Sequence, residues 1–190
     1  MKILINAGHA PNGRPDPGAV GPTGLRECDV TATVAHYVCD YLTSVGITAD
    51  FVQDDDLNRI VAMCRDGDYD LFLSIHCNSF NEYAHGIEVY TSPGFTFADR
   101  FAEYLLDEMH ETFPKLVLRV DPSDGDNDKE AAFFVLIATP CPAALFELPF
   151  ISNPIEEAWL KDDNNLVDAA RAMARAVTSY EVEAVRRGWV

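Results

Sequence analysis

The chain has 190 residues, 48% of them hydrophobic, and its 14 Lys and Arg against 31 Asp and Glu give a formal net charge of −17. This length suffices for one compact domain with a sizeable core, and because no Pro-, Gly- or Ser-rich linker divides it, we expect residues 1–190 to form a single domain. The charge leaves no basic stripe, which argues against nucleic acid or an anionic membrane surface as a partner.

The cysteines and the N-terminus bear on the compartment. The five cysteines are odd in number and lack CxxC or zinc-finger spacing, so we expect no disulfide framework. The N-terminal MKILINAGHA leads directly into a strand and a polar loop, without the pattern of a signal peptide. Since no stretch reaches the roughly 20 apolar residues of a membrane helix, we expect a protein made in the cytoplasm that does not insert into membranes.

Strand and helix patterns alternate in the first half of the chain. In chain order, the expected elements are a strand at 2–6, a helix at 31–45, a strand at 47–52, a helix at 57–64 and a strand at 70–77. The last strand is a continuous apolar run, which is typical of a strand buried on both faces.

The second half continues the alternation. Its expected elements are a strand at 86–91, a helix at 97–109, strands at 133–138 and 143–150, a short helix from Pro154 and a long helix from about Asn165. This order predicts an α/β fold with a mostly parallel sheet and helices on both faces. In such sheets, ligands bind beyond the carboxyl ends of the strands.

Two histidines and one carboxylate are expected at that edge. His9 follows the first strand, His76 lies near the end of the strand at 70–77, and Glu27 opens the first helix. Two imidazoles and one carboxylate, with a fourth position open for water, form the usual ligand set of a catalytic zinc site. The alternative is that these are ordinary strand-end histidines that bind no metal.

Glu147 lies within the apolar stretch ALFELPF, residues 144–150. A carboxylate there costs several kcal/mol in lost hydration unless it has a positive partner. A zinc ion with its water is such a partner, and Glu147 would then move a proton from the attacking water to the leaving nitrogen. The alternative is an ion pair with one of the arginines.

Three sequence blocks occur in order within residues 2–154: NAGHA followed by DPGAVGPTGLRE, then SIHCNS, then PAALFELPFISNP. With this combination the chain resembles the zinc-dependent N-acetylmuramoyl-L-alanine amidases of the type 3 family. The resemblance implies a three-layer αβα domain with a roughly six-stranded sheet and one Zn²⁺ per chain. It also implies peptidoglycan as substrate, cleaved at the amide between N-acetylmuramic acid and L-alanine. By the same resemblance, His9, Glu27 and His76 are the zinc ligands and Glu147 is the catalytic carboxylate.

Other positions carry weaker expectations. The family's Gly-His-Gly-Gly is replaced by GHAPNG, so the resemblance does not imply the contacts of the loop after His9. The acidic stretch 120–131 lacks EF-hand spacing, and we interpret it as a solvated loop flanking the substrate groove. We expect Asn78, just past a ligand, and His85, at the start of a strand, to contact substrate. Asn153 is expected to cap the helix that Pro154 opens.

Three functions remain open from the sequence. The first is a cell-wall amidase, in particular a phage or prophage endolysin that reaches the wall through a holin-type pore and acts after release. The second is a zinc peptidase that cuts within the peptidoglycan stem peptide, which would use the same ligands. The third is a noncatalytic wall-recognition module, although such a module has no need of a buried general base. The sequence does not predict the oligomeric state.

Overall fold

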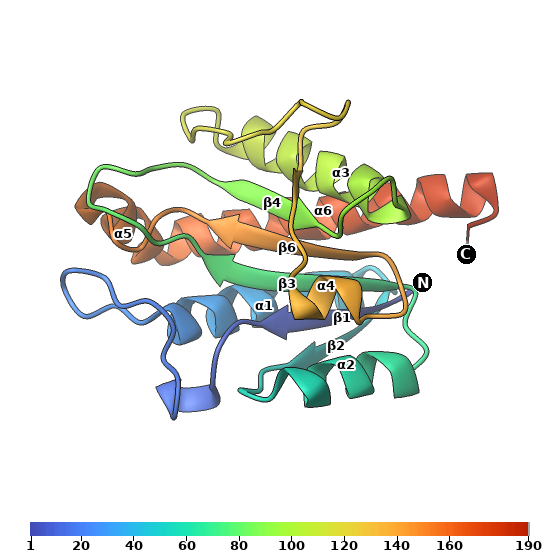
Figure 1. Ribbon diagram of the computed structural model, residues 1–190, viewed down its shortest axis with the longest axis horizontal. Coiled ribbons are helices and arrows are strands. Elements are labelled where there is room, and N and C mark those ends of the chain that lie inside the picture. The colour runs from blue at the N-terminus through green and yellow to red at the C-terminus, as the bar shows by residue number, and fades with distance from the viewer. Residues whose placement is uncertain (190) are drawn as a thin grey trace.

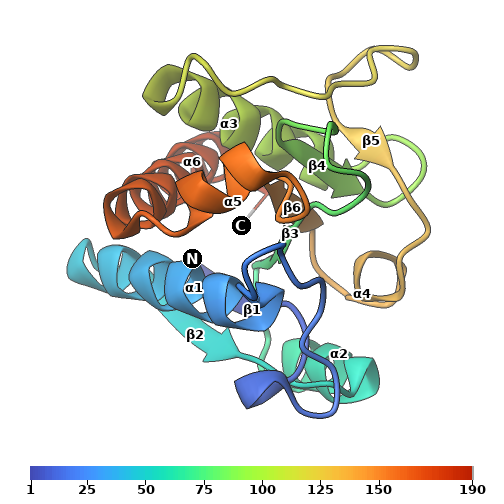
Figure 2. The same ribbon diagram turned by 90° about the vertical axis from the view of Figure 1, so that its left-hand side faces the viewer.

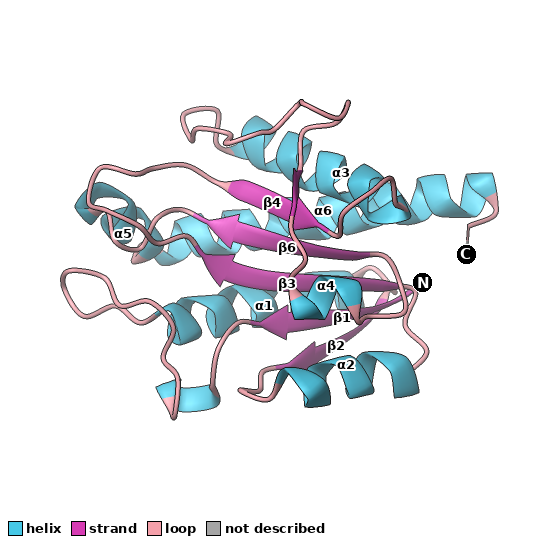
Figure 3. Ribbon diagram, viewed as in Figure 1, coloured by secondary structure: helices cyan, strands magenta, loops and turns pink. Residues whose placement is uncertain are grey.

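The computed structural model describes residues 1–189, which form one six-stranded sheet between layers of helices (Figures 1 and 3). The strands are β1 (Lys2–Ala7), β2 (Thr48–Val52), β3 (Leu71–Cys77), β4 (Glu88–Thr91), β5 (Lys129–Glu130) and β6 (Ala143–Leu148). Across the sheet their order is β2-β1-β3-β6-β4-β5. The first four in that order are parallel, and β4 is antiparallel to β6. The predicted α/β fold with a mostly parallel sheet is therefore confirmed.

The helices form two unequal layers, as Figure 2 shows. One face of the sheet is covered by α1 (Glu27–Ser44), α3 (Phe97–Thr112) and α6 (Asp163–Arg187), with α5 (Pro154–Leu160) beside them. Within residues 1–189, the helices on the other face are α2 (Leu57–Asp66) and the short α4 (Phe134–Ile137). No helix within residues 1–189 combines the length and the apolar character that crossing a bilayer requires.

The alternation of strand side chains assigns residues to these two layers. Ile5, Ile75 and Phe146 are fully buried in the larger core, on the side of α1, α3 and α6. Leu4 and Leu145 belong to a smaller core, which also contains residues of α2 and α4. Successive strand residues point to opposite faces of the sheet. At the carboxyl ends of β1, β3 and β6, the neighbours of these larger-core residues therefore point to the thinly covered face.

The predicted strand at 133–138 is wrong, because Phe134–Ile137 form α4. Buried Val135 and Leu136 are flanked by Phe134 and Ile137, which are 41% and 56% exposed, and this spacing is helical rather than alternating. A short apolar run cannot by itself distinguish a strand from a buried helical turn.

The sixth strand is instead β5, which lies within the acidic stretch 120–131 that we expected to be a solvated loop. That expectation also fails at Asp128, which is only 2% exposed.

The other predicted elements are present with shifted ends, and α6 begins at Asp163. Asn153 caps α5 as predicted, because its side chain accepts hydrogen bonds from the backbone N–H groups of Ile155 and Glu156.

Glu183 joins the two long helices on the thickly covered face. Its side chain is 4% exposed and accepts hydrogen bonds from Arg100 Nε at 2.8 Å and Tyr104 Oη at 2.7 Å, both on α3. Arg187 Nε donates a further bond at 2.7 Å from the next turn of α6. The hydrogen bonds from Arg100 and Tyr104 lower the pKa of Glu183 to about 2.

We expect Glu183→Gln to lower the melting temperature by about 2 to 6 °C at pH 7, because charged hydrogen bonds between α3 and α6 are lost. A carboxyl whose pKa is lowered by folding stabilises the fold above its unfolded pKa of about 4.3 and ceases to do so as the pH falls towards the folded value. The difference from wild type should therefore shrink between pH 6 and pH 3 in thermal melts followed by circular dichroism. Glu111→Gln, at an exposed position of α3, is the matched control and should melt like wild type. Equal melting temperatures for Glu183→Gln and wild type at pH 7 would refute the role of this contact.

Candidate metal centre and active site

His9, Glu27 and His76 meet at the carboxyl edge of the sheet. His9 follows β1, Glu27 is the first residue of α1, and His76 lies in β3. Glu27 Oε2 is 3.0 Å from His9 Nε2, and Glu27 Oε1 is 3.1 Å from His76 Nδ1. One ligand atom from each of the three side chains falls within 4.8 Å of the others. The structure thus brings together the three residues that the sequence analysis assigned as metal ligands.

Two glycines make this close approach possible. A Cβ atom at Gly8 would lie 2.4 Å from the His76 ring, and one at Gly18 would lie 2.4 Å from the His9 ring and 2.6 Å from Glu27 Oε2. Gly18 also has a positive φ of 69°, and His9 itself has a φ of 67°, in the left-handed region. Larger residues at either glycine would displace a ligand side chain.

The Glu27 carboxylate is fixed by several partners. It is 4% exposed and accepts backbone N–H bonds from Ala19 at 2.8 Å and Cys77 at 3.0 Å. Burial raises its pKa, but the hydrogen bonds and charges of His76 and His9 outweigh burial, so the pKa of Glu27 lies well below its usual range. Burial lowers the pKa of His9, yet Glu27 and Asp16 together raise it to about 9. The site is therefore preorganised to hold positive charge, and its donor set of two imidazoles and a carboxylate fits zinc.

Asp16 orients the first of these histidines. Its Oδ2 atom lies 2.8 Å from His9 Nδ1, and its Oδ1 atom accepts a hydrogen bond from Gly18 N at 2.9 Å. A carboxylate at Nδ1 keeps the proton on that nitrogen, so that in the neutral ring the Nε2 lone pair would be available to a metal. The sequence analysis assigned no role to Asp16, although it lies in the quoted DPGA motif.

Glu147 lies on β6 next to His76. The two residues are paired in the parallel ladder between β3 and β6, so their side chains project from the same face. Burial raises the pKa of Glu147 to about 7, and the charges that act on it come from His76, Glu27, Glu88 and His9.

The Oε2 atom of Glu147 is buried and has no hydrogen-bond partner among residues 1–189. The alternative of an arginine partner finds no support, since the nearby Arg119 pairs with Glu88 at 3.1 Å. A buried carboxylate oxygen without a partner is unfavourable in a resting fold. A cation with its water, held by the neighbouring ligands, would supply the missing positive partner.

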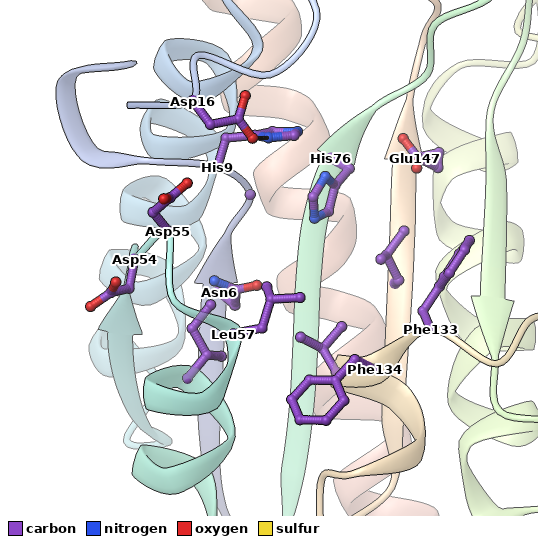
Figure 4. Close-up of a pocket in the computed structure, with 14 residues that line it drawn as sticks. Asn6, His9, Asp16, Asp54, Asp55, Leu57, His76, Phe133, Phe134 and Glu147 are labelled. Carbon is purple, nitrogen blue, oxygen red and sulfur yellow. Dashed lines mark hydrogen bonds and ion pairs between the residues drawn. The ribbon is translucent and has the colours of Figure 1, made fainter. Parts of the chain in front are cut away.

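A cavity of about 440 Å³ opens beside these groups, on the thinly covered face (Figure 4). His9, His76 and Glu147 lie at one end of it, and the apolar side chains of Leu57 and Phe134 lie at the other. Asp54, Asp55 and Phe133 complete its sides. The sequence analysis missed the two phenylalanines as cavity residues because it placed them in a strand.

Asn78 and His85, the predicted substrate contacts, do not line this cavity. Asn78 Nδ2 donates a hydrogen bond at 2.6 Å to Oε1 of Glu88, the first residue of β4. His85 is exposed and borders a separate depression of about 630 Å³ together with Tyr83 and Trp159. A role for either residue in binding substrate remains a prediction.

Comparison with known proteins gives a consistent family. A family model described as N-acetylmuramoyl-L-alanine amidase, Amidase_3, matches residues 3–179. The N-acetylmuramoyl-L-alanine amidase AmiC of Neisseria meningitidis is 28% identical over 228 residues, which cover 98% of this chain and 54% of AmiC. The endolysin of Bacillus phage SPP1 is 29% identical over 180 residues, which cover 92% of this chain and 64% of the endolysin.

The chain therefore spans about half of AmiC and less than two thirds of the endolysin. Among solved structures, the N-acetylmuramoyl-L-alanine amidase AmiC2 of Nostoc punctiforme superimposes with a TM-score of 0.84 at 24% identity, covering 95% of this chain and 96% of AmiC2. This likeness establishes a common fold.

We expect Asp16→Asn to weaken zinc binding by about 10- to 100-fold, because losing the carboxylate frees the His9 ring to change tautomer and orientation. Competition with a chromophoric chelator measures this affinity. Asp55→Asn is the matched control, since Asp55 lines the same cavity and no hydrogen bond joins it to His9 among the described residues. His76→Ala removes a ligand and should lose most of its zinc. If Asp16→Asn bound zinc as tightly as wild type, the orienting role of Asp16 would be wrong.

Proposed function

The chain belongs to the Amidase_3 family of N-acetylmuramoyl-L-alanine amidases, and from this premise we propose that it uses one zinc ion to hydrolyse the amide between N-acetylmuramic acid and L-alanine in peptidoglycan. The observation that carries the proposal is the buried, unpartnered Oε2 atom of Glu147. This atom lies beside a preformed His-Glu-His group at the end of a substrate-sized cavity. A carboxylate so placed is costly for folding and useful for catalysis.

His9 Nε2, the Glu27 carboxylate and His76 Nδ1 would hold the metal. Zinc, when bound, supplies a lowered pKa for a water molecule and a positive charge near the reacting carbonyl oxygen. Other groups of the chain fix the positions of the ligand side chains. Asp16 fixes the His9 ring, and the backbone N–H groups of residues 19 and 77 fix Glu27.

Glu147 would act as the general base and then as the general acid. In its ionised form, the unpartnered Oε2 atom accepts the proton of the attacking water. In its protonated form, the same carboxyl donates that proton to the departing alanine nitrogen. Burial favours the protonated form of this carboxyl, and a nearby cation would favour its ionised form, so the group suits both steps.

The cavity would bind the substrate around the scissile amide. Leu57 and Phe134 offer apolar contact for the alkyl parts of the lactyl-peptide junction, and Phe133 extends this side. Apolar walls also reduce the access of water, which strengthens the electrostatic interactions at the reacting end.

The other two functions are separated by their products. A peptidase acting within the stem peptide would use the same ligands but release amino groups of other residues. A wall-recognition module would bind sacculi and release nothing, and the orphaned carboxylate of Glu147 speaks against it.

We further infer a role in lysis. The similarity to the SPP1 endolysin supports such a role. In this proposal, the protein accumulates in the cytoplasm and reaches the wall through a holin-type pore.

The products of digested sacculi test the reaction. The zinc-loaded protein should release stem peptides that carry a free L-alanine amino group and leave the glycan strands intact. Glu147→Gln should retain zinc and lose at least about 10²-fold of this activity, because a positioned acid and base is removed. Free amino groups on residues other than L-alanine would identify a stem-peptide peptidase instead.

The same variant separates catalysis from folding. Replacing a buried charge by an amide should leave the melting temperature equal or higher. If Glu147→Gln melted lower and kept wild-type activity per folded molecule, Glu147 would be a structural residue and the catalytic assignment would be refuted.

Lysis in cells tests the delivery proposal. Cells that express the protein alone should show no fall in optical density, because the enzyme stays on the cytoplasmic side of the membrane. Co-expression with a pore-forming holin should cause lysis, and Glu147→Gln with the same holin should not. Lysis by the protein alone would contradict delivery through a pore.

A further inference from the structure

Asp126 and Asp128 form a second group of carboxylates, which does not line the cavity of the candidate active site. Asp128 is 2% exposed, and its Oδ2 atom accepts a hydrogen bond from the Thr91 hydroxyl at 2.6 Å. Its Oδ1 atom is buried and has no hydrogen-bond partner, and the same holds for Oδ1 of Asp126, among the residues that the structure describes. The two carboxyls lie within hydrogen-bond reach of each other, but when both are ionised neither oxygen has a donor.

The charges around this pair are unfavourable. Burial and the neighbouring carboxyls of Asp126 and Asp99 together raise the pKa of Asp128 to about 7, although the hydrogen bond from Thr91 acts in the opposite direction. Two basic residues are engaged elsewhere: Lys129, which is adjacent in the chain, and Arg100, which lines a depression together with Asp126. Lys129 pairs with Glu88, and Arg100 pairs with Glu183. Buried like charges of this kind require a proton or a cation between them.

We propose that Asp126 and Asp128 bind a calcium ion, which bridges their unpartnered carboxylate oxygens. Carboxylates are hard oxygen donors, and calcium accepts such donors in irregular geometry, completing its shell with backbone carbonyls and water. The sequence DGDND at 124–128 places acidic side chains at alternate positions of a loop. Zinc is not expected here, because the group has no imidazole or thiolate.

The position of the pair suggests what the ion does. Thr91, which donates to Asp128, is the last residue of β4, and its carbonyl accepts a hydrogen bond from Ala131 N at 3.0 Å. Just beyond, the ring of Phe133 packs edge-on against Tyr90 of β4, with centroids 5.2 Å apart. Calcium would therefore fix the segment 121–131 to β4, immediately before the phenylalanines that line the cavity. The effect on the cavity rests on the proposed function; the binding of calcium does not.

Thermal melts of the zinc-loaded full chain test the site without any substrate. EGTA followed by gel filtration removes calcium, and because EGTA also binds zinc, the chain is then reloaded with ZnCl₂. Addition of 5 mM CaCl₂ should raise the melting temperature by about 3 to 6 °C, as expected for a dissociation constant near the 10⁻⁴ to 10⁻³ M of extracellular calcium modules. Asp126→Asn and Asp128→Asn should abolish the rise. Both variants keep the side-chain shape and remove repulsion, so they should fold at least as stably as wild type without calcium.

Two controls separate specific binding from general screening of a chain with a net charge of −17. MgCl₂ at 5 mM should give a clearly smaller rise, and Asp55→Asn should keep the full response to calcium. Isothermal titration with CaCl₂ should give one ion per chain. The proposal is overturned if calcium produces no rise, if magnesium produces an equal rise, or if Asp128→Asn responds like wild type. Zinc content and amide hydrolysis, measured separately, report on the proposed function and not on this site.

Discussion

The carboxylate of Glu27, held between two imidazoles, is the constraint on which the rest of the structure depends. One of its oxygens reaches His9 and the other reaches His76, and both also accept backbone N–H bonds. This arrangement requires the end of β1, the start of α1 and the end of β3 to lie within a few ångströms of one another. The parallel pairing of β1 with β3 and the connection through residues 8–26, in which Gly8 and Gly18 pack against the ligand side chains, bring these three points together.

The unequal covering of the sheet explains why this site is accessible. α1, α3 and α6 cover one face, and their core supplies most of the apolar burial on which stability depends. The other face has only α2 and α4, which leave a cavity above the carboxyl ends of β1, β3 and β6. The fold thus concentrates stability on one side of the sheet. The other side can carry groups, such as Glu147, that are unfavourable for folding.

The sequence predicted the ligand group because a general rule applies to it. Parallel strands align their carboxyl ends, so residues at the ends of two strands and the start of one helix meet whatever the details of the loops. The same rule says nothing about side chains that act through others. The role of Asp16 was therefore not predicted, because its contact with His9 depends on the path of one loop.

Short segments were predicted less well. The run FFVLIA was read as a strand because its apolar residues are contiguous, but it forms α4, whose buried residues share a core with those of α2. Asp128 was read as solvated because the stretch around it is acidic, but pairing of β5 with β4 carries it beneath the surface. In both cases the decisive contact comes from a segment distant in the sequence, where local pattern has no information.

The central claim is that one zinc ion is held by His9, Glu27 and His76 with Glu147 facing its open position. X-ray diffraction from zinc-soaked crystals, collected on both sides of the zinc absorption edge, locates the metal directly. The account predicts one anomalous peak per chain at this site, about 2.0–2.2 Å from His9 Nε2, His76 Nδ1 and a Glu27 oxygen. It also predicts that Glu147 Oε2 lies within hydrogen-bond distance of a water at the open position. A peak at another site, or a fully occupied site with Glu147 turned away from it, would contradict the account.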